Sequence, residues 1–213
     1  MFRDQILHKV RSALGRTAGE PPSPIPPARL RVPEMAPEER LSVFFRAIEK
    51  LAGKTHHAAS PAEVAAYIAT LIEGKQGVAS NAPVLRECGV TALAGIRTDF
   101  ADREELRAAC TSADFGITGA DYALADTGSL VMLSSRREAR MVSLLPPMHI
   151  AVVPREAILT GLDELYTVLP NPAAVTSSMV FITGPSRTAD IEQILVRGVH
   201  GPGEIHVIVV DRG

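Results

Sequence analysis

The sequence contains no tryptophan, only two cysteines (Cys88 and Cys110), and no long run of apolar residues. Aromatic residues make up 4% of the chain, so an aliphatic core is expected. Two thiols without Cys-x-x-Cys spacing predict neither a disulfide framework nor an iron–sulfur cluster, which ordinarily takes more thiolates than this chain has. No His or Cys spacing resembles a zinc site. We therefore expect no metal, no cofactor and a reducing, cytoplasmic setting.

Charge of either sign is not in excess, since 22 Lys and Arg residues oppose 24 Asp and Glu residues. This balance lacks the basic patch typical of nucleic-acid binding and of attraction to anionic membranes. No apolar run approaches the roughly 18 residues of a membrane span. We predict no nucleic-acid or membrane partner.

Three regions follow from patterning. Residues 1–16 have an amphipathic helical pattern with basic residues on the polar side, which is typical of a helix that docks on its own domain or on a partner. The same pattern also occurs in transit peptides. Residues 17–37 are dense in proline, which predicts an extended linker. Residues 38–213 are expected to form one α/β domain.

The first half of that domain alternates between helical and strand patterns, as parallel sheets with crossover helices do. Ser60, Pro61 and Glu63 form a capping-box signal. Helices are expected over residues 37–53, from Pro61 to about Gly74, and over residues 102–110, and a further short helix is expected after Asn81 as its N-cap. Strands are expected over residues 55–60, 77–80, 90–95 and 113–120.

In the second half of the domain, helical and strand patterns no longer alternate. Closely spaced apolar runs at 128–135, 141–145 and 149–154 indicate a meander of antiparallel or mixed strands. Residues 181–210 then have the pattern of a final strand–helix–strand unit. The fold class predicted from these patterns is α/β, with one main domain built on a mixed sheet.

The loop "TGPSRT" is the first candidate for chemistry. It follows an apolar run and precedes a helical pattern, so its amides could bind a carboxylate or phosphate at a helix N-terminus. Gly184 would allow close approach, and Arg187 could hold two oxygens. The alternative is an ordinary turn with a capped helix. The candidate ligand-binding residues are Thr183, Gly184, Ser186, Arg187 and Thr188.

The stretch "ITGADYALADTGSLV" is the second candidate. Asp121, in a Gly-Ala-Asp turn after a predicted strand, is a possible catalytic acid or base. Each Asp could instead form a local turn with its neighbours. The other candidate ligand-binding residues are Gly119, Asp126, Thr127, Gly128 and Ser129.

The stretch "GVHGPGEIH" raises the question of whether His200 joins these residues. If the preceding helix is a right-handed crossover between parallel strands, its exit loop lies at the opposite edge of the sheet. Topology therefore favours a turn without a ligand.

Four stretches together resemble the LUD-domain family: "TGADYALADTGSLV", "SLLPPMHIAVVP", "FITGPSRTADIE" and "GVHGPGEIHVIVV". The resemblance implies a fold similar to the sugar-phosphate isomerase and CoA-transferase group, which is a Rossmann-like open mixed α/β sheet with added antiparallel strands. In that group a Gly-Ala-Asp turn often borders the active site. It also implies a role in oxidising L-lactate to pyruvate beside two iron–sulfur proteins, one similar to a glycolate oxidase subunit.

Three classes of function remain open. The chain is a non-redox component that binds iron–sulfur partners, a small carboxylate or phosphate, or both; or it is a stand-alone enzyme on a phosphorylated, CoA-linked or carboxylate substrate. The third class is a ligand-sensing or assembly protein without chemistry of its own. A homo-oligomer is possible. These functions rest on one geometric prediction, which is that Asp121 and the amides around Ser186 share one edge of the sheet.

Overall fold

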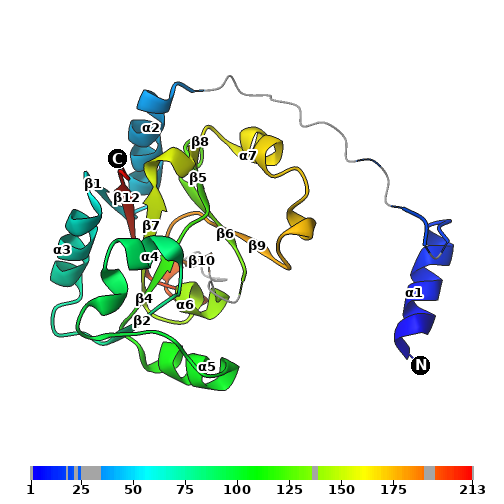
Figure 1. The fold of residues 1–213 in the computed structure, drawn as a ribbon, viewed down its shortest axis with the longest axis horizontal. Helices are drawn as coiled ribbons and strands as arrows, with labels where there is room; N and C mark the ends of the chain where they lie inside the picture. The colour runs from blue at the N-terminus through cyan, green and yellow to red at the C-terminus, as the bar shows by residue number, and fades with distance from the viewer. Residues whose placement is uncertain are drawn as a thin grey trace.

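The computed structural model describes residues 2–17, 19–21, 24, 35–135, 139–189 and 195–212 (Figure 1). Helix α1 spans Phe2–Ala13 and contains no buried residue. The proline-rich segment predicted to be a linker falls largely outside the described residues. None of the described helices is long and apolar enough to cross a membrane.

A parallel sheet forms the centre of the domain, with the strand order β1-β12-β7-β4-β2-β3. Every neighbouring pair in it is parallel. The long strands β7 and β12 lie in the middle, where continuous apolar runs are expected because both faces are covered. Its strands are β1 (Lys54–Ala58), β2 (Gly77–Ala79), β3 (Ile96–Arg97), β4 (Phe115–Gly119), β7 (Met148–Pro154) and β12 (Glu204–Val210).

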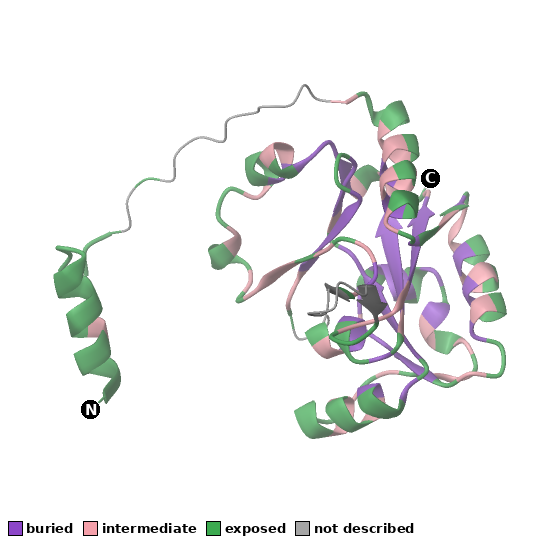
Figure 2. Cartoon of the chain, turned by 180° about the vertical axis from the view of Figure 1, so that it is seen from behind, coloured by how far each residue is buried: buried purple, intermediate pink, exposed green. Residues whose placement is uncertain are grey.

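Helices cover both faces of this sheet. Alternate residues of β7 and β12 point to opposite sides: Ile150 and Ile208 join a core under α3 and α4, whereas Val153 and Val207 join a core under α2. Figure 2 shows the resulting buried central layer. The helices are α2 (Pro37–Lys50), α3 (Pro61–Leu71), α4 (Pro83–Glu87), α5 (Arg103–Ser112), α6 (Arg140–Leu144) and α7 (Leu162–Val168), with short 3-10 turns at Val90–Ala92, Arg155–Ala157 and Pro172–Ala174.

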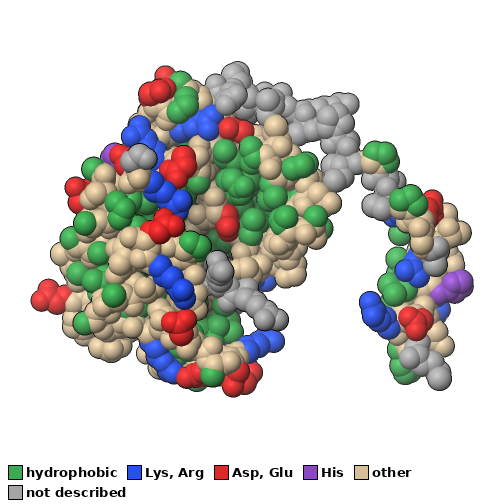
Figure 3. All heavy atoms as spheres, in the orientation of Figure 1, with side chains coloured by type: hydrophobic (Ala, Val, Ile, Leu, Met, Phe, Trp, Pro, Cys, Tyr) green, Lys and Arg blue, Asp and Glu red, His purple; other side chains and the backbone are tan. Residues whose placement is uncertain are grey.

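A second, smaller sheet lies on the α2 side of the first and supplies the predicted antiparallel strands. Its order is β8-β5-β6-β9, antiparallel except for the β5–β8 pair. Figure 3 shows apolar side chains gathered over the region of this sheet and α7, and α7 contributes the exposed residues Leu162, Tyr166 and Val168. The strands are β5 (Tyr122–Leu124), β6 (Ser129–Leu133), β8 (Ile158–Leu159) and β9 (Met179–Ile182).

The α/β class is confirmed, but the predicted meander is only partly correct. Residues 141–145, expected as a strand, lie in and just after α6, which packs so tightly on β4 that a Cβ on Gly116 would lie 1.9 Å from the Val142 carbonyl oxygen. The run 149–154 is β7, a central parallel strand rather than a meander strand. Short apolar runs do not distinguish these cases, since buried helices and strands share the pattern.

Other boundaries shift for local reasons. The expected strand over 90–95 is a 3-10 turn followed by β3, and the N-cap of α4 is Ala82, because the Asn81 side chain accepts a hydrogen bond from Arg86 instead. After "TGPS" the expected helix start is strand β10 (Arg187–Ala189), paired with β11 (Leu195–Arg197).

The N-terminus of α5 offers a first test. Asp102 caps it, since its carboxylate accepts hydrogen bonds of 2.9 Å from the N–H groups of both Glu104 and Glu105. We expect Asp102→Ala to lower the free energy of unfolding by about 0.5–2 kcal/mol, measured by urea denaturation. Asp102→Asn keeps an acceptor oxygen, so it is the matched control and should cost less. Equal losses for the two variants would contradict the capping role.

Candidate functional site

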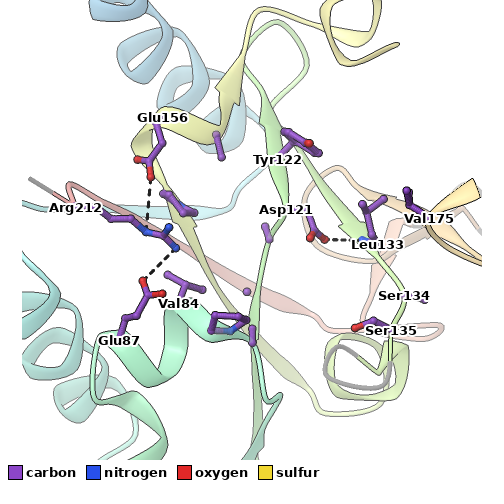
Figure 4. A pocket seen from close by; sticks show the side chains of 16 residues that line it. Val84, Glu87, Asp121, Tyr122, Leu133, Ser134, Ser135, Glu156, Val175 and Arg212 are labelled. Carbon is purple, nitrogen blue, oxygen red and sulfur yellow. Dashed lines mark hydrogen bonds and ion pairs between the residues drawn. The ribbon is translucent and has the colours of Figure 1, made fainter. Parts of the chain in front are cut away.

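A cavity of 680 Å³ lies at the carboxyl edge of the parallel sheet, where β4, β7 and β12 end (Figure 4). This is the edge at which open α/β sheets hold their ligands. The turn after β4 supplies Asp121, the end of β7 supplies Pro154, and Arg212 follows β12. The remaining described lining residues are Ala82, Pro83, Val84, Glu87, Gly119, Ala120, Tyr122, Leu133, Ser134, Ser135, Glu156, Ala157 and Val175.

Asp121 is held in place by the neighbouring strand. Its backbone N–H donates to the Val131 carbonyl over 3.0 Å, and its Oδ2 accepts from the Leu133 N–H over 2.7 Å. Although Asp121 as a residue is exposed, partial burial of its carboxyl raises the pKa of that group, and the hydrogen bond from the Leu133 N–H offsets part of the shift. Asp121 is therefore easier to protonate than an ordinary aspartate, which suits an acid–base or hydrogen-donating group.

Arg212 brings positive charge to the same cavity. Its guanidinium lies 3.4 Å from the Glu87 carboxylate and 3.7 Å from that of Glu156, and Figure 4 shows it between the two. Arg212 is the only Lys, Arg or His among the described residues that line the cavity. Because its side chain is 38% exposed, the two ion pairs are accessible to a competing anion.

A second cavity, of 570 Å³, lies beside the first, since Ser135 lines both. It extends along the carboxyl edge to Ser80 and Asn81, which follow β2, and to Arg103 at the start of α5. The carboxyl edge therefore has room for a ligand larger than a three-carbon acid.

The candidate residues Asp126, Thr127, Gly128 and Ser129 lie away from Asp121. In the β5–β6 hairpin, Tyr122 pairs with Val131 and Leu124 pairs with Ser129, so Asp121 and the 126–129 turn are at opposite ends. Gly128 has a φ of 67° and packs on the backbone of α2, where a Cβ would lie 2.8 Å from the Ile48 nitrogen. This turn is a packing element against α2.

The "TGPSRT" turn lies at the amino edge of the parallel sheet. Ser186 N–H donates to the Pro202 carbonyl over 2.9 Å, just before β12 begins, and Ser129 and Thr183 share a hydroxyl hydrogen bond of 2.7 Å. Thr183, Gly184 and Ser186 line a third cavity, of 200 Å³, which contains none of the lining residues around Asp121. The prediction of a shared edge is therefore wrong, because β9 is an antiparallel strand of the small sheet.

Two further expectations change with this placement. Arg187 donates a hydrogen bond to the Leu51 carbonyl at the end of α2, and Thr188 lies in β10. No helix begins at Ser186 or Thr188, so the reason for an anion site there is lost. His200 does line the cavity that contains Ser186, since both lie at the amino edge.

Sequence reasoning missed two important residues, Arg212 and Glu87, and it favours a structural role for a third, the lone His149. Arg212 follows the last strand and could have been found by applying the carboxyl-edge rule to β12, as it was to β4. Glu87 carries no local signal, because its position depends on how α4 packs. His149 is 1% exposed and lies at the start of β7.

Over the described ranges, no group of three or more His, Cys, Asp or Glu residues is placed to hold a metal ion.

Comparisons with known proteins agree with this architecture. The LUD domain family model matches residues 41–210. The chain is 42% identical over 117 residues to "Lactate utilization protein C" of Halalkalibacterium halodurans, covering 53% of this chain and 51% of that protein. It is 41% identical over 105 residues to the Bacillus subtilis protein of the same name, covering 47% and 44%. The chain thus spans about half the length of the curated relatives it matches.

One solved structure supports the fold. The crystal structure of a DUF162 family protein from Deinococcus radiodurans superposes with a TM-score of 0.66 at 22% identity, covering 83% of this chain and 99% of that one. The mixed α/β fold of this chain is therefore also found in a solved structure. With a family model that covers most of the folded domain, the chain belongs to the LUD domain family.

Proposed function

We propose that the chain is a non-redox component of a lactate-utilisation system and that its carboxyl-edge cavity binds a small carboxylate. The named relatives support the pathway. The observation that carries the ligand is the pairing, on one cavity, of Asp121 with a raised pKa and of Arg212 with accessible ion pairs. Arg212 would bind the carboxylate, and Asp121, when protonated, would donate to one of the carboxylate oxygens.

Calorimetric titration of the purified chain with pyruvate and with L-lactate tests this ligand. We expect Arg212→Gln to weaken binding about 10- to 100-fold, as the loss of a charge-assisted hydrogen bond does. Arg97→Gln is the matched control, because Arg97 pairs with Glu105 on the surface and does not line the cavity. Unchanged affinity in Arg212→Gln would remove Arg212 from the site.

The pH dependence of the same titration tests Asp121. A protonated Asp121 can donate to the ligand, whereas the ionised form repels it. Affinity should therefore fall as pH rises through the raised pKa of Asp121. Asp121→Asn donates at every pH, so its affinity should lose this dependence. An identical pH profile in the two proteins would show that Asp121 does not face the ligand.

The partners proposed are the iron–sulfur proteins of the system. The exposed apolar residues of α1 and of α7 are the candidate docking surfaces. Co-purification of the chain with iron–sulfur proteins from cells grown on lactate tests this role. Intact lactate oxidation in cells that lack the chain would contradict it.

An enzymatic role is the second candidate, favoured by the pKa of Asp121 and by the length of the carboxyl edge. Asp121 would act as a general acid or base on a phosphorylated, CoA-linked or carboxylate substrate that extends towards Asn81. Turnover by the purified chain alone, abolished in Asp121→Asn, would establish this function. Inactivity of the chain against a broad panel of such substrates would count against it.

A further inference from the structure

The 200 Å³ cavity at the amino edge is built by segments far apart in the sequence. Ser143 and Leu144 come from α6, His149 from the start of β7, and residues 180–186 from β9 and its turn. The loop before β12 closes it with residues 200–202, and Ile205 lines it from the start of β12. Backbone hydrogen bonds fix these loops together: Ser186 N–H to the Pro202 carbonyl at 2.9 Å, and Gly203 N–H to the Pro147 carbonyl at 3.0 Å.

Among the described residues that line this cavity, His149 is the one fully buried polar side chain that is incompletely hydrogen-bonded. It is 1% exposed, and its Nε2 shares a hydrogen bond of 2.8 Å with the buried Thr118 hydroxyl. Its Nδ1 has no hydrogen-bond partner in the described part of the chain. A buried nitrogen left without a hydrogen-bond partner is rare and unfavourable, so a partner from outside the described residues is expected.

Either tautomer of His149 requires the same kind of partner. If Thr118 donates to Nε2, then Nδ1 carries the proton and needs an acceptor oxygen. If Nε2 donates to Thr118, then Nδ1 accepts and needs an O–H donor. A hydroxyl group meets both requirements, because it can donate or accept.

The charge of the cavity wall constrains the rest of the ligand. No Asp, Glu, Lys or Arg is among the described lining residues, and most of the wall is apolar. Burial keeps His149 neutral near pH 7 by lowering its pKa to about 4. Arg187 directly follows the lining residue Ser186, but its guanidinium donates a hydrogen bond to the Leu51 carbonyl. An anion placed there would lose its hydration without gaining a counter-charge, which is unfavourable.

We propose that this cavity is a second binding site, for a small uncharged molecule that carries a hydroxyl group on an apolar body and hydrogen-bonds to His149 Nδ1. The ligand enters between Leu144, Phe181 and His200, which are exposed at the surface. The site is separate from the carboxyl-edge cavity and does not depend on the function proposed for it.

Nitrogen NMR of the ¹⁵N-histidine-labelled full chain, titrated with phenol and with butan-2-ol, tests the proposal. We expect the His149 Nδ1 resonance to move saturably with an alcohol. His206 is an internal control: it is also buried, with an Nδ1 that lacks a partner among the described residues, but it does not line this cavity, so it should not move. The same alcohols should bind at least about tenfold more weakly to His149→Phe.

A second variant guards against loss of folding in His149→Phe. A Cβ on Gly201 would meet the Ser186 side chain at an ordinary contact distance of 3.4 Å, so Gly201→Val should fold while narrowing the cavity. It should also weaken alcohol binding. The proposal would be overturned if His149 Nδ1 were in contact with a water molecule that neither alcohol displaces. Water would then be the hydrogen-bond partner of Nδ1. A saturable response to L-lactate but not to the alcohols would overturn the assignment to an uncharged ligand.

Discussion

Phe115→Ala should lower the free energy of unfolding by about 3–5 kcal/mol, as expected for a fully buried ring removed from a core. Phe115 is 0% exposed and stands at the start of β4, where it packs among residues of α3, α4 and β7. Gly77 of β2 pairs with Phe115, and a side chain does not fit at this position because a Cβ there would lie 2.3 Å from the Phe115 ring. The neighbouring strand is thus shaped around this ring and cannot collapse readily into the space it leaves.

Urea denaturation of the two proteins measures this loss. Phe181→Ala is the matched control, since Phe181 is 39% exposed and should contribute much less. Similar losses for the two variants would contradict the placement of Phe115. Because Asp121 follows β4 by two residues, a loosened β4 should also weaken ligand binding at the carboxyl edge.

His149 should make the protein less stable in mild acid by roughly 3 kcal/mol. Burial lowers its pKa from 6.5 to about 4 in the folded state, and the unfolded chain keeps the ordinary value. Between these two values the unfolded chain binds the proton and the folded chain does not. Stability is therefore full above pH 6.5, falls as pH drops towards 4 and then levels off.

The difference between the wild type and His149→Phe isolates this contribution. Glu204 and Asp211 have lowered pKa values, so they also lose stabilisation in acid, but they do so in both proteins. We expect the free energy of unfolding of the wild type to fall more steeply than that of His149→Phe between pH 6.5 and 4. Parallel curves would mean that His149 is reached by water and is protonated in the fold.

Elements with strong local signals were predictable from the sequence. Ser60 and Glu63 mark the start of α3, and the Ser60 hydroxyl accepts from the Glu63 N–H as a capping box requires. Pro37 begins α2, and the apolar stretch before Gly119 is β4. In each case the residues that decide the structure lie within one or two turns of chain.

Elements decided by tertiary packing were not predictable. Residues 141–145 carry an apolar pattern that suits a strand, but contact with Gly116 of β4 places them against the sheet as a helix. Arg187 follows a turn that suits a helix start, yet it enters the β10–β11 pair. Nothing in these short segments specifies their partners, which come from distant parts of the chain.

The residues of the candidate carboxylate site can also be divided into those that were predictable from the sequence and those that were not. Asp121 was predictable, because a turn after a parallel strand must lie at the carboxyl edge of the sheet. Its expected neighbour Ser186 was not at that edge, since strand direction in the small sheet depends on the pairing of β6 with β9. The true companion, Arg212, comes from the far end of the chain, and it reaches the cavity because β12 runs parallel to β7.

The most direct test of the proposed carboxylate site is a crystal structure of the protein soaked with pyruvate. We expect electron density for the acid at the carboxyl edge, with its carboxylate on the Arg212 guanidinium and an oxygen within hydrogen-bond distance of Asp121. Density for pyruvate beside His149 at the amino edge, or an empty carboxyl edge at saturating pyruvate, would contradict it.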